Sequence, residues 1–358
     1  MTDPIDRRVM LGAAGLLGAA ALSRVASAGP LNPPAGPITP TGKTLTEVEP
    51  RIAISDVSTP GNAGSIFRIT QPGSYYLTGN LAGQAGKHGI VIAADDVTVD
   101  LMGFAVRGVT SSLSGIHGEG FRRRITIRAG VVTGWGEHGI DVGTVSSGRG
   151  MLVELIHSTN NGQYGICAPS QSVLRDCIAS TNLAGGVYTE DSAVIVNCAA
   201  SSNTGFGFEV GGSSGVERCI AVGNTAAGFT AAAGTHITGC NARFNGTRGI
   251  WLAGNDCTAR DNTCSSNGFS NGGEGIYAGA TACLIEGNHC TTNGRGIRVV
   301  APGNFIARNR CSGNATANWD IAADNKCLVV DGINAPAFSG NSGGVSPGST
   351  DPNANFTY

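Results

Sequence analysis

The chain has 358 residues, enough for a sizeable core, and its 23 Lys and Arg against 25 Asp and Glu give a formal net charge of −2. A near-neutral chain lacks the basic surface of nucleic-acid-binding proteins, which argues against nucleic acid as a partner. Glycine is abundant at 56 residues and only 13% of residues are charged, a composition that fits a chain with many bends better than a compact globule.

Residues 1–28 read as an export signal. Arg7 and Arg8 precede a weakly apolar stretch from 12 to 22, which is followed by Ala26-Ser27-Ala28. This order resembles a twin-arginine signal cleaved after Ala28 and implies export of the folded protein to the periplasm or beyond. The alternative is a cytoplasmic leader with a chance Arg pair. No apolar run reaches the roughly 18 residues of a membrane span, so none is expected in the mature protein.

The next two segments do not follow the repeat that comes after them. Residues 29–42 are rich in Pro and Gly, which predicts a flexible leader. Residues 43–81 contain short strand-like runs without a common spacing. A stack of coils has an open end that atypical terminal segments cover, so 43–81 is predicted as the N-terminal cap and first coil.

The organising feature is a repeat in which Asn is followed four residues later by Gly, five times at a constant step of 21 residues. The pairs are Asn161/Gly165, Asn182/Gly186, Asn203/Gly207, Asn224/Gly228 and Asn245/Gly249. So short a period indicates one structural unit stacked on copies of itself. It suits a coil of about three short strands at a spacing of about 4.8 Å. Asn fits the bend because it tolerates left-handed backbone and its stacked amides can bond along the ladder.

The glycine column extends in both directions beyond this core. It continues, at spacings of 21 to 26 residues, through Gly89, Gly115, Gly139, Gly275 and Gly296. We therefore predict an all-β parallel β-helix over residues 82–330, with about ten to eleven coils. Residues 331–358 are rich in Gly, Ser, Pro and Asn and lack the apolar content to fold alone, which predicts a flexible tail.

The cysteines follow the same register. Cys177, Cys198, Cys219 and Cys240 recur every 21 residues, and in later coils Asn262, Asn288 and Asn309 take their place while Cys264, Cys290 and Cys311 appear two positions on. Two positions along a strand lie on the same face, so we predict buried free thiols that act as small apolar residues. The alternative is a stripe that binds a soft metal.

A column of outward residues lies two positions after each Gly. The residue directly after Gly is apolar and predicted to point inward, so its successor must point outward. Read up the stack, this outward column is Val91, His117, Asp141, Cys167, Tyr188, Glu209, Thr230, Trp251, Tyr277 and Arg298. The position before Gly flanks it with His88, His138, Tyr164, Phe206, Arg248, Glu274 and Arg295.

Aromatic rings beside charged groups suit an extended sugar chain. The rings supply apolar area for sugar faces, while charged groups bind hydroxyls or uronate carboxylates. The predicted substrate-binding residues are Tyr188, Trp251, Tyr277, Arg298, Arg295 and Arg248. The alternative is that an exposed strand simply favours such residues without a ligand.

Five outward residues are candidates for catalysis. Glu190 and Glu209 lie on a diagonal between adjacent coils, with Cα atoms about 8 Å apart at ordinary strand spacings. That separation suits a carboxylate pair that cleaves a glycosidic bond with inversion, or one that bridges a cation. Glu119 and Asp141 form a similar diagonal with His117 beside them. The alternative is a set of solvated surface carboxylates, and no metal ligand is assigned.

Residues 82–330, with their Asn-x-x-x-Gly-Ile-like bends and Cys/Asn ladder, resemble the right-handed parallel β-helix family of pectate lyases and polygalacturonases. The resemblance implies polysaccharide lyases, hydrolases or epimerases that act on an outward sheet face, often with Ca²⁺. The Asn-Thr-Asp and Gly-His-Gly signatures of polygalacturonases are absent from the sequence, so the resemblance specifies the coil and not a reaction.

These patterns support one leading interpretation and two alternatives. The leading one is an exported β-helix protein that binds, and in an enzymatic version cleaves, a polysaccharide or cell-envelope glycan as a lyase or hydrolase. The first alternative is a non-catalytic envelope or adhesive solenoid. The second, weaker one compares the chain with periplasmic β-helix proteins that deliver copper. No cofactor follows from the residues themselves, and Ca²⁺ is implied only by the resemblance.

Overall fold

The computed structural model describes residues 49–142, 148–268, 272–331 and 352–357. The predicted signal, the predicted leader and most of the predicted tail lie outside the described residues. Contacts divide the chain into a unit from Met1 to Pro50 and a unit from Arg51 to Tyr358. The strands described below belong to the second unit.

The described residues form strands, bends and loops, with no helix among them. One sheet has 13 strands. Its members are β2 (Pro60–Asn62), β3 (Ser65–Ile69), β6 (His88–Ile92), β9 (Ile116–Gly118), β11 (Ile140–Asp141), β13 (Ile166–Ala168), β16 (Val187–Thr189), β19 (Phe208–Val210), β22 (Phe229–Ala231), β25 (Ile250–Leu252), β28 (Glu274–Ala278), β31 (Arg295–Val299) and β34 (Ala317–Ile321).

A second sheet of 24 strands supplies the other sides of the coils. Its members are β1 (Ile52–Ala53), β4 (Gly73–Tyr76), β5 (Leu81–Ala82), β7 (Val97–Asp100), β8 (Ala105–Arg107), β10 (Thr126–Thr133), β12 (Leu152–Thr159), β14 (Val173–Arg175), β15 (Ile178–Ser180), β17 (Val194–Val196), β18 (Ala199–Ser201), β20 (Gly215–Glu217), β21 (Ile220–Val222), β23 (His236–Thr238), β24 (Asn241–Arg243), β26 (Thr258–Arg260), β27 (Thr263–Ser265), β29 (Leu284–Glu286), β30 (His289–Thr291), β32 (Phe305–Ala307), β33 (Arg310–Ser312), β35 (Lys326–Cys327), β36 (Val329–Asp331) and β37 (Asn355–Thr357).

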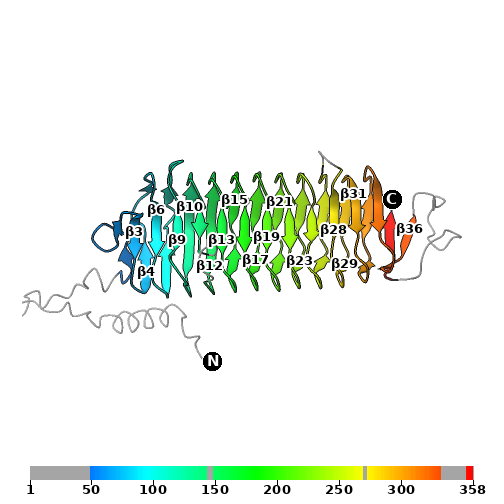
Figure 1. Cartoon of the computed structure of the whole chain (residues 1–358), viewed down its shortest axis with the longest axis horizontal. Helices are drawn as coiled ribbons and strands as arrows, with labels where there is room; N and C mark the ends of the chain where they lie inside the picture. The colour runs from blue at the N-terminus through cyan, green and yellow to red at the C-terminus, as the bar shows by residue number, and fades with distance from the viewer. Residues whose placement is uncertain (1–48, 143–147, 269–271, 332–351, 358) are drawn as a thin grey trace, which may run out of the picture. The chain divides into compact units, whose positions relative to one another are not determined.

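Successive coils pair in parallel along one axis (Figure 1). One coil consists of β13, β14 and β15, and the next coil pairs with it strand for strand through β16, β17 and β18. Among the strands of the described residues, only β2 and β3 pair antiparallel, at the N-terminal end of the sheet. Without β2, the 13-stranded sheet marks about twelve turns. The predicted parallel β-helix is confirmed.

The last of these turns is hidden from the sequence pattern. In β34, Ala317 and Trp319 lie opposite Arg295 and Ile297 of β31, so Asn318 takes the place of the glycine column. The prediction of ten to eleven coils counts glycines that are followed by an apolar residue. A coil with Asn318 in the glycine position is not found by that pattern.

The inward faces are apolar, as predicted. The residues after the glycines are 0 to 1% exposed, namely Ile166, Val187, Phe208, Phe229 and Ile250. The rings of Phe208 and Phe229 stack with centroids 4.9 Å apart and an angle of 4° between their planes. All eleven cysteines are free, ten are buried, and Cys327 is half-buried.

Buried Asn side chains link the coils. Each Nδ2 donates to the Oδ1 of the Asn one coil further on, at 2.8 to 3.0 Å. This ladder runs through Asn161, Asn182, Asn203, Asn224, Asn245, Asn267, Asn293 and Asn314. The amide bonding predicted for these residues is thus present.

The left-handed backbone predicted for the bend Asn falls instead on the residue before it. Thr181 and Ser202 have φ angles of 54° and 56°, while Asn182 and Asn203 are not in this region. The Asn side chain lies inside the coil, and the preceding residue makes the bend. This arrangement also explains the glycine: a Cβ added at Gly207 would lie 2.8 Å from Asn224 Nδ2 of the next coil and 2.5 Å from a backbone oxygen.

Candidate functional site

One column of residues runs along the outer surface of the 13-stranded sheet, and we call it the outward strip. Strand register places its members directly opposite one another in successive coils. The outward strip consists of Arg68, Val91, His117, Asp141, Cys167, Tyr188, Glu209, Thr230, Trp251, Tyr277, Arg298 and Asp320. The structure adds Arg68 and Asp320 to the column read from the sequence.

Histidines, a carboxylate and a thiol lie on and beside the N-terminal part of the outward strip. The rings of His88 and His117 stack with centroids 4.2 Å apart, and His117 Nδ1 lies 3.5 Å from Asp141 Oδ2. His138 Nδ1 lies 3.3 Å from Cys167 Sγ. Asp141 is 4% exposed and Cys167 is fully buried, so this part of the strip is largely closed to a large ligand.

Burial also shifts the pKa values of the histidines and the thiol in this region. It lowers the pKa of His138 and, together with the neighbouring His117, that of His88. Burial raises the pKa of Cys167 well above its usual range, so the thiol stays protonated at neutral pH. A neutral thiol is a poor nucleophile, which makes Cys167 a weak candidate for covalent chemistry.

In the predicted Glu119–Asp141 pair, each carboxylate contacts a basic side chain. Arg68 Nη1 donates to Glu119 Oε1 at 2.8 Å, and Arg68 Nη2 contacts the second carboxylate oxygen. The hydrogen bond from Arg68 lowers the pKa of Glu119. Glu119 is therefore engaged by Arg68, while Asp141 faces His117.

The predicted Glu190–Glu209 pair lines one hollow of about 370 Å³, which we call the acidic hollow. Its lining residues are Ser170, Tyr188, Thr189, Glu190, Asp191, Glu209, Val210, Gly211, Thr230, Ala232 and Ala253. Of the six substrate-binding residues predicted from the sequence, only Tyr188 belongs to this set. A single hollow thus brings together two predicted catalytic residues and one predicted binding residue.

Neutral donors hold the three carboxylates of the acidic hollow. Glu190 Oε2 accepts from the backbone N and the Oγ of Ser170, at 3.2 and 2.9 Å. Glu209 Oε2 accepts from the hydroxyl of Tyr164 at 2.5 Å, and Asp191 Oδ1 accepts from the backbone N of Gly212 at 2.7 Å.

These carboxylates, together with burial, raise the pKa of the tyrosines beside them. Burial raises the pKa of Tyr164, and the hydrogen bond to Glu209 raises it further. Burial likewise raises the pKa of Tyr188, with added contributions from Glu190 and Glu209. Both phenols therefore remain neutral hydrogen-bond donors at ordinary pH.

Predicted binding residues at the C-terminal end of the outward strip form one network. The Arg248 guanidinium lies 4.8 Å from the ring centroid of Trp251 and 4.2 Å from that of Tyr277. Arg248 Nε also donates to Glu274 Oε2 at 3.1 Å, and Arg298 Nη1 donates to Glu274 Oε1 at 3.2 Å. Arg248 thus covers ring faces that we expected a sugar to contact.

Asp320 closes this network, and the sequence did not single it out. Arg295 Nε and Arg298 Nε each lie 3.1 Å from Asp320 Oδ2. Asp320 sits two positions after Asn318, where the glycine column is interrupted. Continuing the outward column one coil beyond its last glycine, Gly296, would therefore have identified Asp320 from the sequence.

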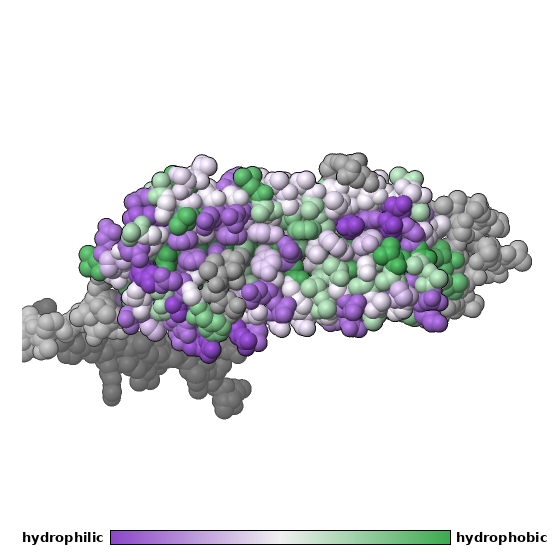
Figure 2. Space-filling model, in the orientation of Figure 1, coloured by the Kyte–Doolittle hydropathy of each residue, from purple (hydrophilic) through white to green (hydrophobic). Residues whose placement is uncertain are grey.

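The Asp-Asp and Arg-Arg-Arg sequences of the N-terminal coils pair with each other. Arg124 Nη2 donates to Asp96 Oδ2 at 2.7 Å, and Arg122 Nη1 lies 3.9 Å from Asp95 Oδ1. They belong to bends of adjacent coils. On the face seen in Figure 2, hydrophilic residues are concentrated over the N-terminal coils.

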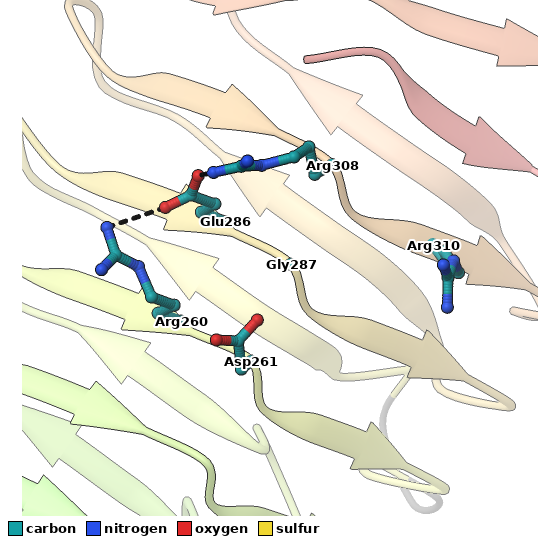
Figure 3. Close-up of a pocket in the computed structure, with 6 residues that line it drawn as sticks. All are labelled: Arg260, Asp261, Glu286, Gly287, Arg308 and Arg310. Atoms are coloured by element: carbon teal, nitrogen blue, oxygen red, sulfur yellow. Dashed lines mark ion pairs between the residues drawn. The ribbon is translucent and has the colours of Figure 1, made fainter. Parts of the chain in front are cut away.

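A second hollow, of about 550 Å³, lies on the 24-stranded sheet and was not predicted (Figure 3). Glu286 lies between two arginines: Arg260 Nη2 is 2.8 Å from Glu286 Oε2, and Arg308 contacts Oε1. Asp261 and Arg310 line the side away from this bridge. Arg260 and Glu286 are directly opposite in β26 and β29, 26 residues apart, so an insert in the coil conceals their pairing.

In the described part of the chain, no three His, Cys, Asp or Glu side chains converge in a way that could hold a metal ion. None of the described segments is a helix long and apolar enough to span a membrane.

Comparisons with known proteins agree with this fold. The family model for the right-handed beta helix region matches residues 88–238. The A-module of mannuronan C-5 epimerase AlgE4 from Azotobacter vinelandii is similar over 77% of this chain and 88% of its own, with 13% identity and a TM-score of 0.55. The AlgE6 A-module of the same organism is similar over 80% of this chain and 90% of its own, with 17% identity and a TM-score of 0.54.

A tailspike is similar as well. The Dettilon tailspike protein (gp208) matches over 73% of this chain with 14% identity and a TM-score of 0.54, and this chain spans 61% of the tailspike chain. A comparison with curated protein sequences gave no match. At such low identities the similarity to solved structures shows the fold alone.

Proposed function

We propose that this chain, a right-handed parallel β-helix repeat protein, binds a polysaccharide along its outward strip and holds one sugar unit in the acidic hollow. The observation that carries the proposal is that Tyr188, Glu190 and Glu209 line a single hollow of about 370 Å³. Pockets of a few hundred Å³ with an aromatic wall and a few polar groups are typical of small-ligand sites.

The chemistry of the acidic hollow suits a sugar. The ring of Tyr188 is half-buried and offers apolar area to a sugar face, and charged hydrogen bonds from hydroxyls to carboxylates are stronger than neutral ones. Thr230, on the next coil, lines the hollow as well, so a chain that leaves the hollow along the outward strip does so past Thr230. Beyond it lies the Arg248 network, whose Trp251 and Tyr277 rings are already covered on one side.

Cleavage is a narrower proposal than binding. Hydrolysis needs one carboxyl group protonated as the acid and the other ionised. Glu190 and Glu209 both accept hydrogen bonds, from Ser170 and Tyr164, so the two carboxyl groups have similar surroundings and neither is singled out as the acid. The geometry therefore supports binding more directly than hydrolysis. The similar fold of a mannuronan C-5 epimerase module supports a polysaccharide as the ligand class.

A polysaccharide panel tests the proposal. Acidic and neutral polysaccharides would be scored for binding, for new reducing ends and for unsaturated products, with Ca²⁺ and with a chelator. We expect Tyr188→Ala to weaken binding by about tenfold, which corresponds to the roughly 1.4 kcal/mol of a lost ring contact. Glu217→Gln is the matched control, because Glu217 is exposed on the other sheet beside Arg218. Absence of binding to any polysaccharide by the wild-type protein would refute the function and leave the adhesive solenoid as the leading interpretation.

A further inference from the structure

We propose that the acidic hollow selects a positively charged sugar unit, an amino sugar with a free amino group, and disfavours a uronate. This inference rests on the proposed function, since it specifies which polysaccharide the outward strip binds.

Charge balance is the first observation. Several carboxylates on the coils have a guanidinium partner, among them Asp100 with Arg128, Glu154 with Arg175, and Glu286 with Arg260. The acidic hollow is different. Its lining contains three carboxylates and no Lys, Arg or His.

The contacts of these carboxylates give the second observation. Within the described residues, the hydrogen bonds to Glu190, Asp191 and Glu209 come from a serine, a backbone N and a tyrosine hydroxyl, all of them neutral. Three negative charges therefore remain uncompensated around one cavity. A uronate carboxylate placed there would be repelled, whereas an ammonium group would be attracted.

A sugar ammonium fits this hollow better than a metal ion does. The carboxylates line the hollow without converging, since no three potential metal-ligating side chains among the described residues form a metal-binding group. Spread carboxylates suit a ligand of the size of a sugar ring. The ring of Tyr188, beside Glu190 and Glu209, adds a surface that attracts cations.

An unpartnered hydroxyl provides an independent observation. Thr230 belongs to the outward strip and lines the acidic hollow, and its Oγ1 atom is buried without a hydrogen-bond partner among the described residues. Buried polar atoms are nearly always hydrogen-bonded, so an orphaned hydroxyl at a hollow points to a polar ligand that supplies the missing bond.

The test compares oligosaccharides that differ in charge. Binding of wild-type protein would be measured by calorimetry below neutral pH with oligomers of β-1,4-linked glucosamine, β-1,4-linked N-acetylglucosamine, galacturonate and mannuronate, and on an array of other glycans in free-amine and N-acetylated forms. We expect the free-amine glycans to bind about tenfold more tightly than their N-acetylated forms and more tightly than uronates, with a preference that shrinks as salt screens the charges.

Isosteric variants locate the effect. Glu190→Gln and Glu209→Gln should each reduce free-amine binding several-fold and leave N-acetylated binding nearly unchanged, while Glu217→Gln changes neither. Circular dichroism checks that all variants fold. Equal affinity for free-amine and N-acetylated forms, or tightest binding of a uronate, would overturn this inference while leaving the proposed function intact. Absence of binding to every glycan would overturn both.

Discussion

Replacing Asn203 with Ala tests whether the amide ladder stabilises the coil stack. Asn203 Oδ1 accepts from the backbone N and the Nδ2 of Asn182, both at 3.0 Å. Asn203 Nδ2 donates to the backbone oxygen of Ala179 at 3.1 Å and to Asn224 Oδ1 at 2.8 Å. Four hydrogen bonds at about 1 kcal/mol each predict a loss of about 4 kcal/mol in the free energy of unfolding.

Burial makes the loss severe. Asn203 is 1% exposed, so no bulk water replaces the lost partners, and the backbone N of Asn182 is left without an acceptor. A loss of about 4 kcal/mol is a large share of the 5 to 15 kcal/mol that stabilises ordinary proteins. Because coils in a solenoid contact mainly their neighbours, the defect should first open the coils around residue 203.

Chemical denaturation followed by far-ultraviolet circular dichroism measures the effect. Thr204→Ala is the matched control, because Thr204 is the exposed next residue and its substitution should change the free energy of unfolding by less than about 0.5 kcal/mol. Asn203→Asp keeps the shape but loses both Nδ2 donors and places a charge against Asn224 Oδ1, so it should destabilise at least as much as Ala. A loss below about 1 kcal/mol for Asn203→Ala would refute the ladder argument.

Three further predictions follow from the described geometry and the sequence. Phe229→Ala should cost about 3 kcal/mol or more of stability, because its ring is fully buried against another coil, whereas Trp251→Ala on the outward strip should cost no more than about 1 kcal/mol; thermal unfolding of both variants checks this, and the reverse order would place the inward face one residue off. Burial lowers the pKa of His138, so the unfolded state binds more protons than the folded state below about pH 6.5. The free energy of unfolding should therefore fall as the pH falls through this range. Denaturation curves at several pH values should show a smaller dependence on pH for His138→Gln. Replacing Arg7 and Arg8 with Lys should leave the precursor in the cytoplasm, as fractionation would show, and normal export of that variant would contradict the twin-arginine prediction.

The candidate site was predictable only in part, as two of its regions illustrate. Strand spacing alone placed Glu190 and Glu209 on adjacent coils, and the structure brings both into the acidic hollow with Tyr188. Spacing gave no means to predict that Arg248 lies against the Trp251 and Tyr277 rings. A short side chain stays near its backbone position. The long side chain of an arginine can reach several neighbours, and only the tertiary structure determines which of them its guanidinium contacts.

The fold itself was determined by the sequence because a solenoid turns sequence period into spatial distance. Residues 21 positions apart, such as Phe208 and Phe229, are neighbours in space, so a column of like residues in the sequence is a face of the molecule. The tertiary structure decided what the period does not encode. The left-handed conformation belongs to Ser202 rather than Asn203, since a buried Asn bonds to the next coil only if the residue before it makes the bend. Likewise, the insert between β26 and β29 conceals the pairing of Arg260 with Glu286, because loops lengthen the sequence interval without moving the strands apart.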